Sequence, residues 1–325
     1  MTHAIVIEHY GEPEVLQWKE MVLGPPGPGE ALVQQTAVGL NFIDVYHRRG
    51  LYPLHSLPAV IGQEAAGRVE AIGPNVTEVS VGDRVAYAGG PMGAYGEARI
   101  IPAHRLLKLP NGIVDQQAAA MMLKGMTAEY LVRRTYAVEP GDTILFHAAA
   151  GGVGSIACQW ANHLGATVIG TVGSRQKAAL ATSYGCEHVI VTSEEDFVKR
   201  VREITRGEGV QVVYDSVGKD SFMRSLDCLM PRGLMVSFGQ SSGMVPPLDI
   251  TNLSAKGSLY LTRPTLMHYT ASRRELVRSA AALFDVVLSG SVKIEIGQTY
   301  PLRDAAKAHA DLEGRKTTGS TVLIP

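Results

Sequence analysis

The stretch "TILFHAAAGGVGSIACQWANHLGA", residues 143–166, constrains the fold of this chain more than any other. An apolar run leads into Gly151, Gly152 and Gly154, and apolar side chains then recur at helical spacing. A buried strand that passes through a glycine turn directly into a helix is typical of the start of a βαβ unit. The stretch therefore predicts a parallel sheet covered by helices.

The spacing of these glycines resembles a dinucleotide-binding turn. Against the pattern G-x-G-x-x-G, the chain has Ala149 at the first position, followed by Gly151 and Gly154. The middle glycine lets the backbone approach a pyrophosphate, and the last one permits close helix packing. The N-terminus of the helix offers unpaired N–H groups to the anion. The alternative is a glycine-rich turn that binds no ligand.

The segment after the next predicted strand indicates which dinucleotide would bind. An NAD site usually places Asp or Glu there to accept from the ribose 2′-hydroxyl. The chain has "GSRQK" at residues 173–177, which contains no acid. Arg175 and Lys177 would neutralise a 2′-phosphate, and Ser174 would hydrogen-bond to it, so the charges favour NADPH over NADH. The alternative is a helix start whose basic residues face water.

The rhythm of predicted elements divides the chain into three segments. Over the first ~120 residues, short apolar stretches alternate with glycine and proline, which predicts a β-rich, partly open barrel with few helices. Beyond it, continuous apolar strands alternate with helical segments, which predicts a doubly wound parallel sheet. "SRRELVRSAAALFDVVLSG" and "RDAAKAHADLEG" then predict two helices, and "GSTVLIP" predicts a closing strand. We expect a β-rich substrate domain at 1–124, a nucleotide domain at 125–264 and a return to the first domain at 265–325.

Composition and charge argue against several other classes of protein. Lys and Arg number 30 against 31 Asp and Glu, so no global field draws the chain to nucleic acid or an anionic membrane. No apolar run approaches the roughly 20 residues that span a bilayer. Cys158, Cys186 and Cys228 are well separated, so neither a disulfide framework nor a cysteine-rich zinc site forms locally. The reducing cytoplasm is the simplest compartment.

The stretch "IGQEAAG", residues 61–67, raises the question of a metal site. A β-rich first domain, a nucleotide domain and a C-terminal return together resemble the medium-chain dehydrogenase/reductase superfamily. Its zinc-containing members carry Gly-His-Glu-x-x-Gly with the His as a ligand, whereas this chain has Gln63 there. Asn41 and Asp44 stand where a Cys is expected, and no four-cysteine lobe occurs between 85 and 110. The resemblance therefore implies a zinc-free protein in which residues 61–67 form a turn at the start of a strand.

Within this superfamily the chain is most similar to the NADPH:quinone reductases, the zinc-free relatives of zeta-crystallin. The similarity covers nearly the whole chain. It rests on "GLNFIDVYHRRGLYP" at 39–53, "GQEAAGRVEAIGPNV" at 62–76, "GDTILFHAAAGGVGSIACQWA" at 141–161, "GSRQK" at 173–177, "VYDSVG" at 213–218, "TRPTL" at 262–266 and the tail "KTTGSTVLIP". It implies a Rossmann domain plus a GroES-like domain, with NADPH as cofactor and a small-molecule quinone as acceptor. A quinone polarises its own carbonyls, so hydride transfer to it needs no Lewis-acid metal.

The resemblance also implies roles for single residues. Asn41 would lie near the nicotinamide and its ribose, while Tyr46 and Tyr52 would line the quinone pocket, with simple packing as the alternative for both tyrosines. Together with the motifs above, the implied cofactor site consists of Asn41, Thr127, Ala150, Gly151, Gly152, Val153, Gly173, Ser174, Arg175, Lys177, Ser216, Phe238, Gln240 and Arg315. For Arg315 the alternative is a surface salt bridge. His47, Arg48 and Arg49 are expected to form a solvated face, and the proton for the reduced oxygen could come from Tyr46, Tyr52 or water.

A homodimer is the expected assembly. Besides the family resemblance, the apolar stretch at 233–250 could add an edge strand across a two-fold axis with its later part. The alternative is a buried strand followed by a loop.

Two other functions stay open from the sequence. One is an NADPH-dependent reductase of alkenes such as 2-enones or enals, because zinc-free relatives share the glycine turn. The other is a non-enzymatic protein that senses NADPH or contacts RNA. Against the latter, the chain has no basic stripe with interleaved aromatics, and its aromatic content is only 6%.

Overall fold

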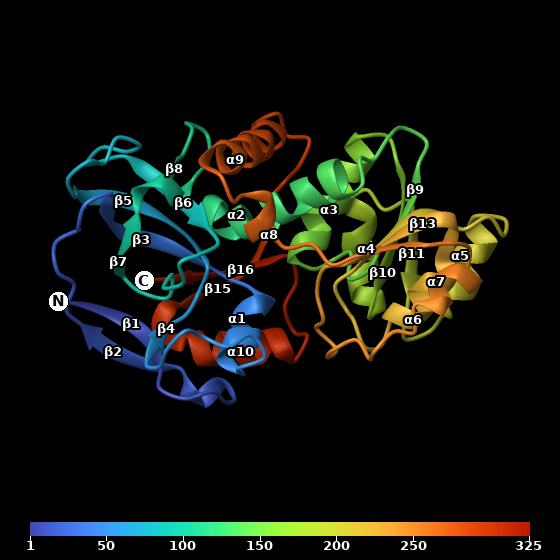
Figure 1. The fold of residues 1–325 in the computed structure, drawn as a ribbon, viewed down its shortest axis with the longest axis horizontal. Coiled ribbons are helices and arrows are strands. Elements are labelled where there is room, and N and C mark those ends of the chain that lie inside the picture. The colour runs from blue at the N-terminus through green and yellow to red at the C-terminus, as the bar shows by residue number, and fades with distance from the viewer. The chain divides into compact units, whose positions relative to one another are not determined.

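The computed structural model describes all 325 residues and divides into two compact units. The first unit contains Met1–Met126, Thr270–Leu288 and Ile294–Pro325, which are the blue to teal and the red parts of the ribbon (Figure 1). The second unit contains Thr127–Tyr269 and Ser289–Lys293.

The first unit is built on two sheets. The larger one has seven strands in the order β15-β16-β3-β5-β6-β8, with β7 paired to β3, and the smaller has the order β2-β1-β4. The strands of the larger sheet are β3 (Glu30–Leu40), β5 (Glu64–Ile72), β6 (Arg84–Ala88), β7 (Ala98–Pro102), β8 (Leu107–Lys108), β15 (Ile296–Pro301) and β16 (Ser320–Ile324). Those of the smaller sheet are β1 (Thr2–Ile7), β2 (Gln17–Met21) and β4 (Ala59–Val60).

The closing strand reaches the β-rich sheet from the far end of the chain. β16 pairs antiparallel with β3, so that Thr321 lies opposite Leu40, and it pairs in parallel with β15. Over residues 30–36 of β3 buried side chains alternate with less buried ones, as expected for a strand with one face on a core, and the last four residues of the strand are all buried. That core contains Ile5, Val33, Val38, Val85, Tyr87, Ile101 and Leu323, among others.

Few helices accompany these sheets. The long α2 (Asp115–Tyr130) continues from the first unit into the second, and the two helices predicted near the C-terminus are confirmed as α9 (Arg273–Leu288) and α10 (Ala305–Glu313). The remaining helical segments are α1 (Phe42–Arg48) and the short 3₁₀ turns Pro13–Val15, Ala103–Arg105 and Leu302–Asp304.

The second unit is a six-stranded parallel sheet in the order β11-β10-β9-β12-β13-β14. The chain first builds outward from β9 to β11 and then restarts on the other side of β9, which is the doubly wound order of a Rossmann fold. Its strands are β9 (Thr143–Phe146), β10 (Thr167–Val172), β11 (His188–Val191), β12 (Val210–Asp215), β13 (Leu229–Ser237) and β14 (Tyr260–Thr262). The predicted fold class is confirmed.

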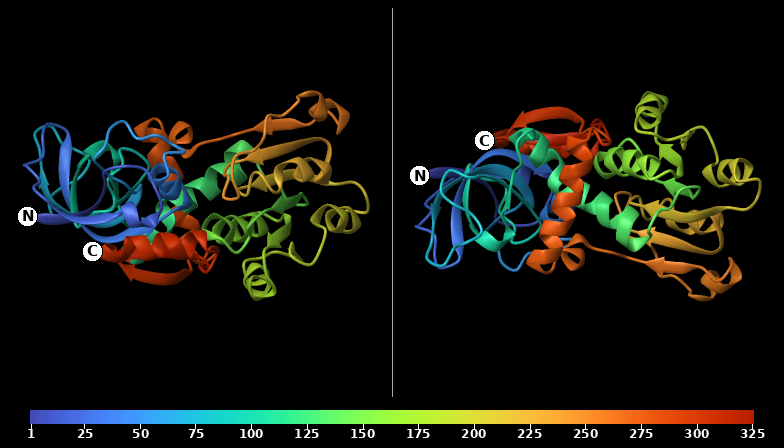
Figure 2. Two further views of the ribbon diagram at one scale, coloured as in Figure 1. Left: turned by 90° about the horizontal axis from the view of Figure 1, so that it is seen from below. Right: turned by 90° about the horizontal axis from the view of Figure 1, so that it is seen from above.

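Helices connect these strands, as the green to orange ribbon shows from two sides (Figure 2). They are α3 (Gly152–His163), α4 (Arg175–Ser183), α5 (Phe197–Ile204), α6 (Phe222–Ser225), α7 (Thr251–Ala255), α8 (Leu266–Tyr269), a π-helical turn at Leu131–Thr135 and a 3₁₀ turn at Leu226–Cys228. The central strands are almost wholly buried, which explains their continuous apolar sequences. Leu145, Ile169, Val213, Leu226 and Met235 belong to the core that they form.

The later part of the stretch 233–250 forms no strand within the chain itself. β13 ends at Ser237, and residues 239–250 form a loop, so strand pairing of this segment across a two-fold axis stays a prediction. Pro246 and Pro247 lie within it and lack the N–H that a ladder needs. The edge of the sheet on this side is β14 instead.

Candidate active site

Asn41 is placed by two buried carboxylates at the start of α1. It is the N-cap of the helix and is almost fully buried. Its side-chain Nδ2 donates to Glu64 Oε1 at 2.8 Å, and its backbone N–H donates to Asp44 Oδ2 at 2.9 Å. Both ends of Asn41 are therefore fixed, which orients a residue that the sequence assigned to the nicotinamide.

Glu64 is the centre of this arrangement. It is fully buried at the start of β5 and accepts from Leu123 N at 2.6 Å and from Lys124 Nζ at 2.6 Å. A buried carboxylate needs a partner charge and hydrogen bonds to offset its lost hydration, and Lys124 supplies both. The turn at Gly62, whose φ is +94°, leads directly into this residue.

The two predicted tyrosines contact each other. The rings of Tyr46 and Tyr52 meet edge to face with centroids 5.2 Å apart, and Tyr52 N donates to Tyr46 O at 3.2 Å. Tyr46 is buried and also packs against Phe42, whereas Tyr52 is half-buried. Asn41 and the two tyrosines thus lie on α1 and the segment that follows it.

The expectation of a solvated face at residues 47–49 is wrong for two of the three. Arg48 is fully buried and His47 nearly so, and only Arg49 is exposed. Arg48 Nη1 donates to Glu313 Oε2 at 2.7 Å and Nε donates to Gly11 O at 3.0 Å. The partners of Arg48 come from both ends of the chain, so no local pattern could indicate its burial.

Gln63, which stands where a zinc ligand would be, contacts a histidine. His47 Nδ1 lies 3.0 Å from Tyr52 O, a carbonyl that can only accept, so Nδ1 carries the hydrogen. His47 Nε2 then accepts from Gln63 Nε2 at 2.9 Å. Burial lowers the pKa of His47, which favours this neutral form. Nowhere in the chain do three or more His, Cys, Asp or Glu side chains form a group that could hold a metal ion.

The glycine turn between β9 and α3 places the predicted pyrophosphate-binding residues at the start of a helix. Gly151 is the N-cap of α3, Ala150 precedes it, and Gly152 and Val153 are the first two residues of the helix. A Cβ on Gly154 would lie 2.4 Å from Ala148 O, so no side chain fits there. The last glycine therefore permits α3 to begin tightly against the preceding turn, as its place in the motif predicts.

The predicted phosphate-binding residues lie at the end of β10 and the start of α4. Ser174 is the N-cap of α4, and a Cβ on Gly173 would meet nothing within 4 Å, so the backbone there is open. Arg175 is highly exposed and is held by Glu194, with Nε 2.8 Å from both carboxylate oxygens. This contact lowers the pKa of Glu194. The sequence segment 173–177 has no acid, but the fold brings one to it.

The carboxyl ends of β12 and β13 bring together three further predicted residues. Phe238 N donates to Asp215 O at 2.9 Å, and Ser241 N donates to Ser216 O at 3.0 Å. Gln240 is buried, and its Oε1 accepts from Arg263 Nη2 at 2.9 Å. Ser216, Phe238 and Gln240 therefore share the sheet edge at which open α/β sheets bind ligands.

Two predicted cofactor residues lie apart in the sequence from these motifs. Thr127 is in the last turn of α2, at the first residue of the second unit. Arg315 follows α10 in the first unit and has a φ of +58°. Asn41 also belongs to the first unit, whereas the other predicted cofactor residues belong to the second.

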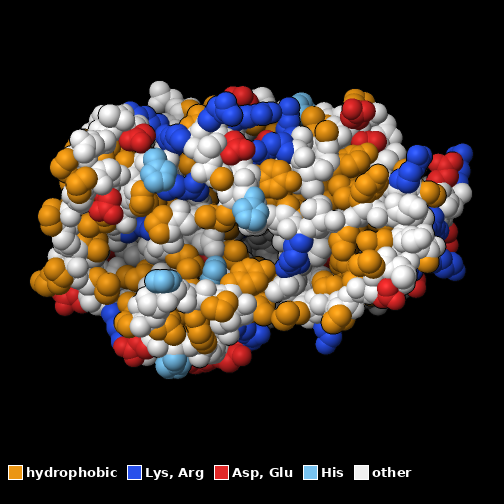
Figure 3. All heavy atoms as spheres, viewed as in Figure 1, with side chains coloured by type: hydrophobic (Ala, Val, Ile, Leu, Met, Phe, Trp, Pro, Cys, Tyr) orange, Lys and Arg blue, Asp and Glu red, His pale blue; other side chains and the backbone are white.

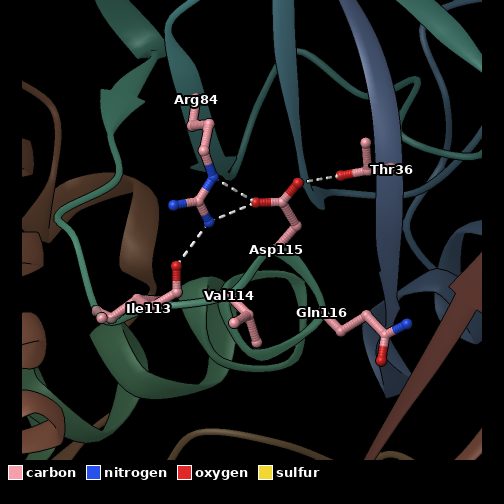
Figure 4. A pocket seen from close by; sticks show the side chains of 7 residues that line it. Thr36, Arg84, Ile113, Val114, Asp115 and Gln116 are labelled. Carbon is pink, nitrogen blue, oxygen red and sulfur yellow. Dashed lines mark hydrogen bonds and ion pairs between the residues drawn. The ribbon is translucent and has the colours of Figure 1, made fainter.

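A surface hollow elsewhere in the first unit contains none of the predicted residues. It is lined by Thr36, Arg84, Ile113, Asp115 and neighbouring residues (Figure 4). Arg84 donates to Asp115 Oδ1 through Nε and Nη2, at 2.9 and 2.6 Å, and Thr36 Oγ1 donates to Asp115 Oδ2 at 2.8 Å. Its charged groups are paired with each other, so they join α2 to the sheet rather than offer a ligand site.

Comparison with known proteins identifies the family. The family described as "Alcohol dehydrogenase GroES-like domain" matches residues 27–111, and "Zinc-binding dehydrogenase" matches residues 152–284. The quinone oxidoreductase of Pseudomonas aeruginosa is 52% identical over 325 residues, which is 100% of both chains. The chain belongs to the quinone oxidoreductase branch of the medium-chain dehydrogenase/reductase superfamily. The family resemblance inferred from the sequence is thereby confirmed.

Two further relatives of this quinone oxidoreductase branch bear on function. The crystal structure of Escherichia coli quinone oxidoreductase complexed with NADPH has a TM-score of 0.98 and 51% identity, and covers 99% of this chain and 100% of that one. The 2-haloacrylate reductase of a Burkholderia species is 48% identical, over 100% of this chain and 99% of its own. None of the helices has the length and apolar character needed to cross a membrane.

Sequence reasoning missed four candidate site residues. Glu64 was seen only as part of a turn, and Lys124, Glu194 and Arg263 were not singled out. Glu64 follows Gln63, which stands where related enzymes have a zinc ligand, and this position could have indicated that Glu64 belongs to the site. Lys124, Glu194 and Arg263 are connected to the site only by tertiary contacts, so no sequence motif marks them.

Proposed function

We propose that this chain is an NADPH-dependent quinone oxidoreductase that transfers hydride to a quinone without zinc. The observation that carries the proposal is the glycine turn at the switch point of a parallel sheet, followed by a basic rather than an acidic segment after the second strand. The 51% identity to an enzyme solved with NADPH supports it over the whole length of the chain.

The residues present fit an NADPH molecule. The turn at Gly151 and the N-terminus of α3 would hold the pyrophosphate, because helix N-termini offer N–H donors to anions. Ser174, Arg175 and Lys177 would hold the 2′-phosphate. Ser216, Phe238 and Gln240 would lie along the nicotinamide half, together with Thr127, Asn41 and Arg315. When bound, NADPH supplies the hydride.

The acceptor side of the site would be formed by α1 and the segment after it. Asn41, fixed by Asp44 and Glu64, would orient the nicotinamide and its ribose through its amide. Tyr46 and Tyr52 would present aromatic surface and hydroxyl groups to a flat quinone. Either hydroxyl, or water, would deliver the proton that hydroquinone formation consumes.

An alkene reductase is the second candidate function. The 48% identity to a protein named 2-haloacrylate reductase favours it, since hydride addition to an activated alkene uses the same cofactor chemistry. Gln63, Tyr46 and Tyr52 would then face an alkene conjugated to a carbonyl or carboxylate rather than a quinone.

One experiment distinguishes the two functions. Steady-state oxidation of NADPH is measured against a panel of quinones, 2-enones, enals and 2-haloacrylate, at equal acceptor concentrations. We expect the highest kcat/KM with a quinone. A kcat/KM that is larger for an activated alkene than for every quinone would replace the first function with the second, and no oxidation with any acceptor would overturn both.

We also infer a homodimer formed through the β14 edge. Tyr260 and Leu261 on this edge strand are 63% and 40% exposed, and Met244 and Ile250 add exposed apolar surface nearby in sequence. An unpaired, apolar edge strand is a ready surface for pairing with a second copy.

Three unpaired cysteines, all buried, support a cytoplasmic location.

A further inference from the structure

A series of buried hydrogen bonds extends from Asp44, which accepts from the backbone N–H of Asn41. The proposed reaction assigns no role to this series. Asp44 Oδ2 lies 3.0 Å from Tyr95 Oη, and Tyr95 Oη lies 3.0 Å from His309 Nε2. His309 Nδ1 lies 3.1 Å from Arg48 Nη1. All four side chains are completely buried, and they come from α1, the segment before β7, and α10.

The direction of each hydrogen bond in this series can be assigned. Arg48 can only donate, so His309 Nδ1 accepts and His309 Nε2 carries the hydrogen. His309 Nε2 therefore donates to Tyr95 Oη, and the Tyr95 hydroxyl donates to Asp44 Oδ2. Every donor in the series points toward Asp44.

Asp44 has one oxygen that these donors do not reach. Oδ2 accepts from Asn41 N–H and Tyr95, whereas Oδ1 is buried without any hydrogen-bond partner. An unpartnered oxygen on a buried carboxylate is costly when the group is ionised, which favours the neutral form of Asp44.

The burial of Asp44 favours its protonation near neutral pH. Burial raises its pKa to about 7, and the charge of Glu64 on β5 adds to this increase. The hydrogen bonds from Asn41 and Tyr95 and the charge of Lys124 on α2 act in the opposite direction. Arg48 on α1 faces Tyr95, and burial next to Arg48 lowers the pKa of His309 on α10 to about 3, which keeps that histidine neutral.

We propose that Asp44 is a positioning residue for the reaction: its neutral form leaves intact the Glu64 contact that orients the Asn41 side chain for hydride transfer, and its ionised form weakens that contact. The inference rests on the proposed function. With Asp44 neutral, Glu64 and Lys124 form a balanced pair that fixes the Asn41 side chain. With Asp44 ionised, its charge repels the Glu64 carboxylate, and the Glu64 contact with the Asn41 side chain loosens.

The test is the pH profile of kcat/KM for a quinone at saturating NADPH, from pH 5.5 to 9. We expect kcat/KM of the unmodified protein to fall about five-fold as the pH rises through about 7, which corresponds to about 1 kcal/mol in the barrier. Asp44→Asn keeps an oxygen that accepts from Asn41 and Tyr95 but cannot ionise. Its profile should lack this inflection, whatever its absolute activity.

Tyr95→Phe provides a second, independent variant. It removes a hydrogen bond that favours the ionised form of Asp44, so the inflection should move to higher pH rather than disappear. A purely structural role of the network would lower activity in both variants without moving the inflection. If Asp44→Asn does not fold, the shift in Tyr95→Phe alone decides the matter.

The ionisation of Asp44 can be followed without activity. The pKa of Asp44 is raised on folding from 3.8 to about 7, so its protonation stabilises the folded state fully below pH 3.8, and this contribution is lost as the pH rises from there to about 7. The thermal unfolding midpoint of the unmodified protein should therefore fall over this range relative to Asp44→Asn. An activity inflection that persists unchanged in Asp44→Asn would overturn the inference, whereas a protein that titrates as expected but reduces no quinone would overturn the proposed function.

Discussion

Glu64 joins three segments of the chain through one buried carboxylate. Its donors are the Asn41 amide, the Leu123 N–H and the Lys124 ammonium, at 2.6 to 2.8 Å. Removing one member of a buried ion pair leaves the other charge unpaired, which costs more than the pair itself contributes. Single residues at this site therefore act through their partners as much as through the ligand.

Arg175 and Lys177 should differ in how much they contribute to NADPH binding. A charge-assisted contact to the 2′-phosphate contributes on the order of 1.5–3 kcal/mol, so Lys177→Ala should weaken NADPH by roughly 10- to 150-fold. Arg175→Ala should weaken it less, because Arg175 already pairs with Glu194 and must share its donors. The dissociation constant of NADH should stay nearly constant in both variants.

Fluorescence titration with each cofactor measures these constants, and Gln176→Ala on the same turn serves as the control. Raising the salt concentration should weaken NADPH more than NADH, since screening acts on the phosphate dianion. The assignment of "GSRQK" as a phosphate site is lost if NADH binds the unmodified protein as tightly as NADPH, or if both variants weaken the two cofactors equally.

His309 should make the fold sensitive to acid. Its pKa is lowered from 6.5 to about 3, so below pH 6.5 the unfolded chain binds a proton that the folded chain does not. The free energy of unfolding should consequently fall by about 2 kcal/mol between pH 6.5 and 5 from this residue alone. In His309→Gln this part of the decrease should vanish, as measured by urea unfolding across the pH range.

His163 is exposed, so His163→Gln is the matched control for the urea unfolding series. It should leave the dependence of the free energy of unfolding on pH unchanged. Equal slopes in the unmodified protein and in His309→Gln would show that His309 takes up its proton in the folded state.

At the scale of elements, the turn between β9 and α3 is the most restrictive part of the nucleotide unit. Its strand is buried at the centre of the sheet, and its helix starts directly after Gly151. Because the backbone of the turn packs closely against the first turn of α3, the turn fixes where this helix begins, and the helix N-terminus would face the pyrophosphate of the proposed cofactor.

Gly154→Ala tests this placement. The added Cβ would lie 2.4 Å from Ala148 O, a backbone atom that cannot move without displacing the turn. We expect the free energy of unfolding to fall by about 1–3 kcal/mol and the affinity for NADPH to fall with it. Denaturant unfolding and cofactor titration are the measurements, and Gly24→Ala, where a Cβ meets nothing within 4 Å, is the control. Unchanged affinity in Gly154→Ala would remove this turn from the cofactor site.

At the scale of the whole molecule, charge and apolar surface set the partners that the chain can have. On the face drawn in Figure 3, basic and acidic side chains are interspersed with apolar ones, and the basic groups gather mainly over α9. With a net charge of −1, long-range attraction to a polyanion is weak. On this face the interspersed charges do not form the continuous basic stripe that binding to nucleic acid requires.

A dimer through β14 should be disrupted by charge on that edge. Leu261→Lys places an ammonium on an exposed position of the strand, so it should shift the mass in light scattering from two chains toward one without unfolding the subunit. A lysine at Val81, which is exposed in the other unit, is the control. A monomeric mass of the unmodified protein at micromolar concentration would contradict the dimer.

Catalysis should not depend on zinc. Gln63 is held by His47 and no clustered ligands are present, so elemental analysis after dialysis should find no stoichiometric zinc. Treatment with a chelator should leave quinone reduction unchanged. About one zinc per chain, with activity lost to the chelator, would contradict this expectation.

The sequence by itself determined the parts of this protein that depend on neighbours along the chain. The glycine turn at 149–154, the buried parallel strands and the basic segment 173–177 can all be seen locally, because strand, helix and turn preferences act over a few residues. They indicated the fold class and the cofactor. That Gln63 replaces a zinc ligand is implied by the family resemblance.

Only the tertiary structure decided which charges meet. Glu194 reaches Arg175 because β10 and β11 are parallel neighbours whose carboxyl ends lie together. Glu64 meets Lys124, and Asp44 is connected through Tyr95 to His309, over separations along the chain that carry no periodic signal. Burial of Arg48 was missed for the same reason. Desolvation and pairing depend on the complete packed environment of a side chain, so the pKa of Asp44 and its role could follow only from the folded chain.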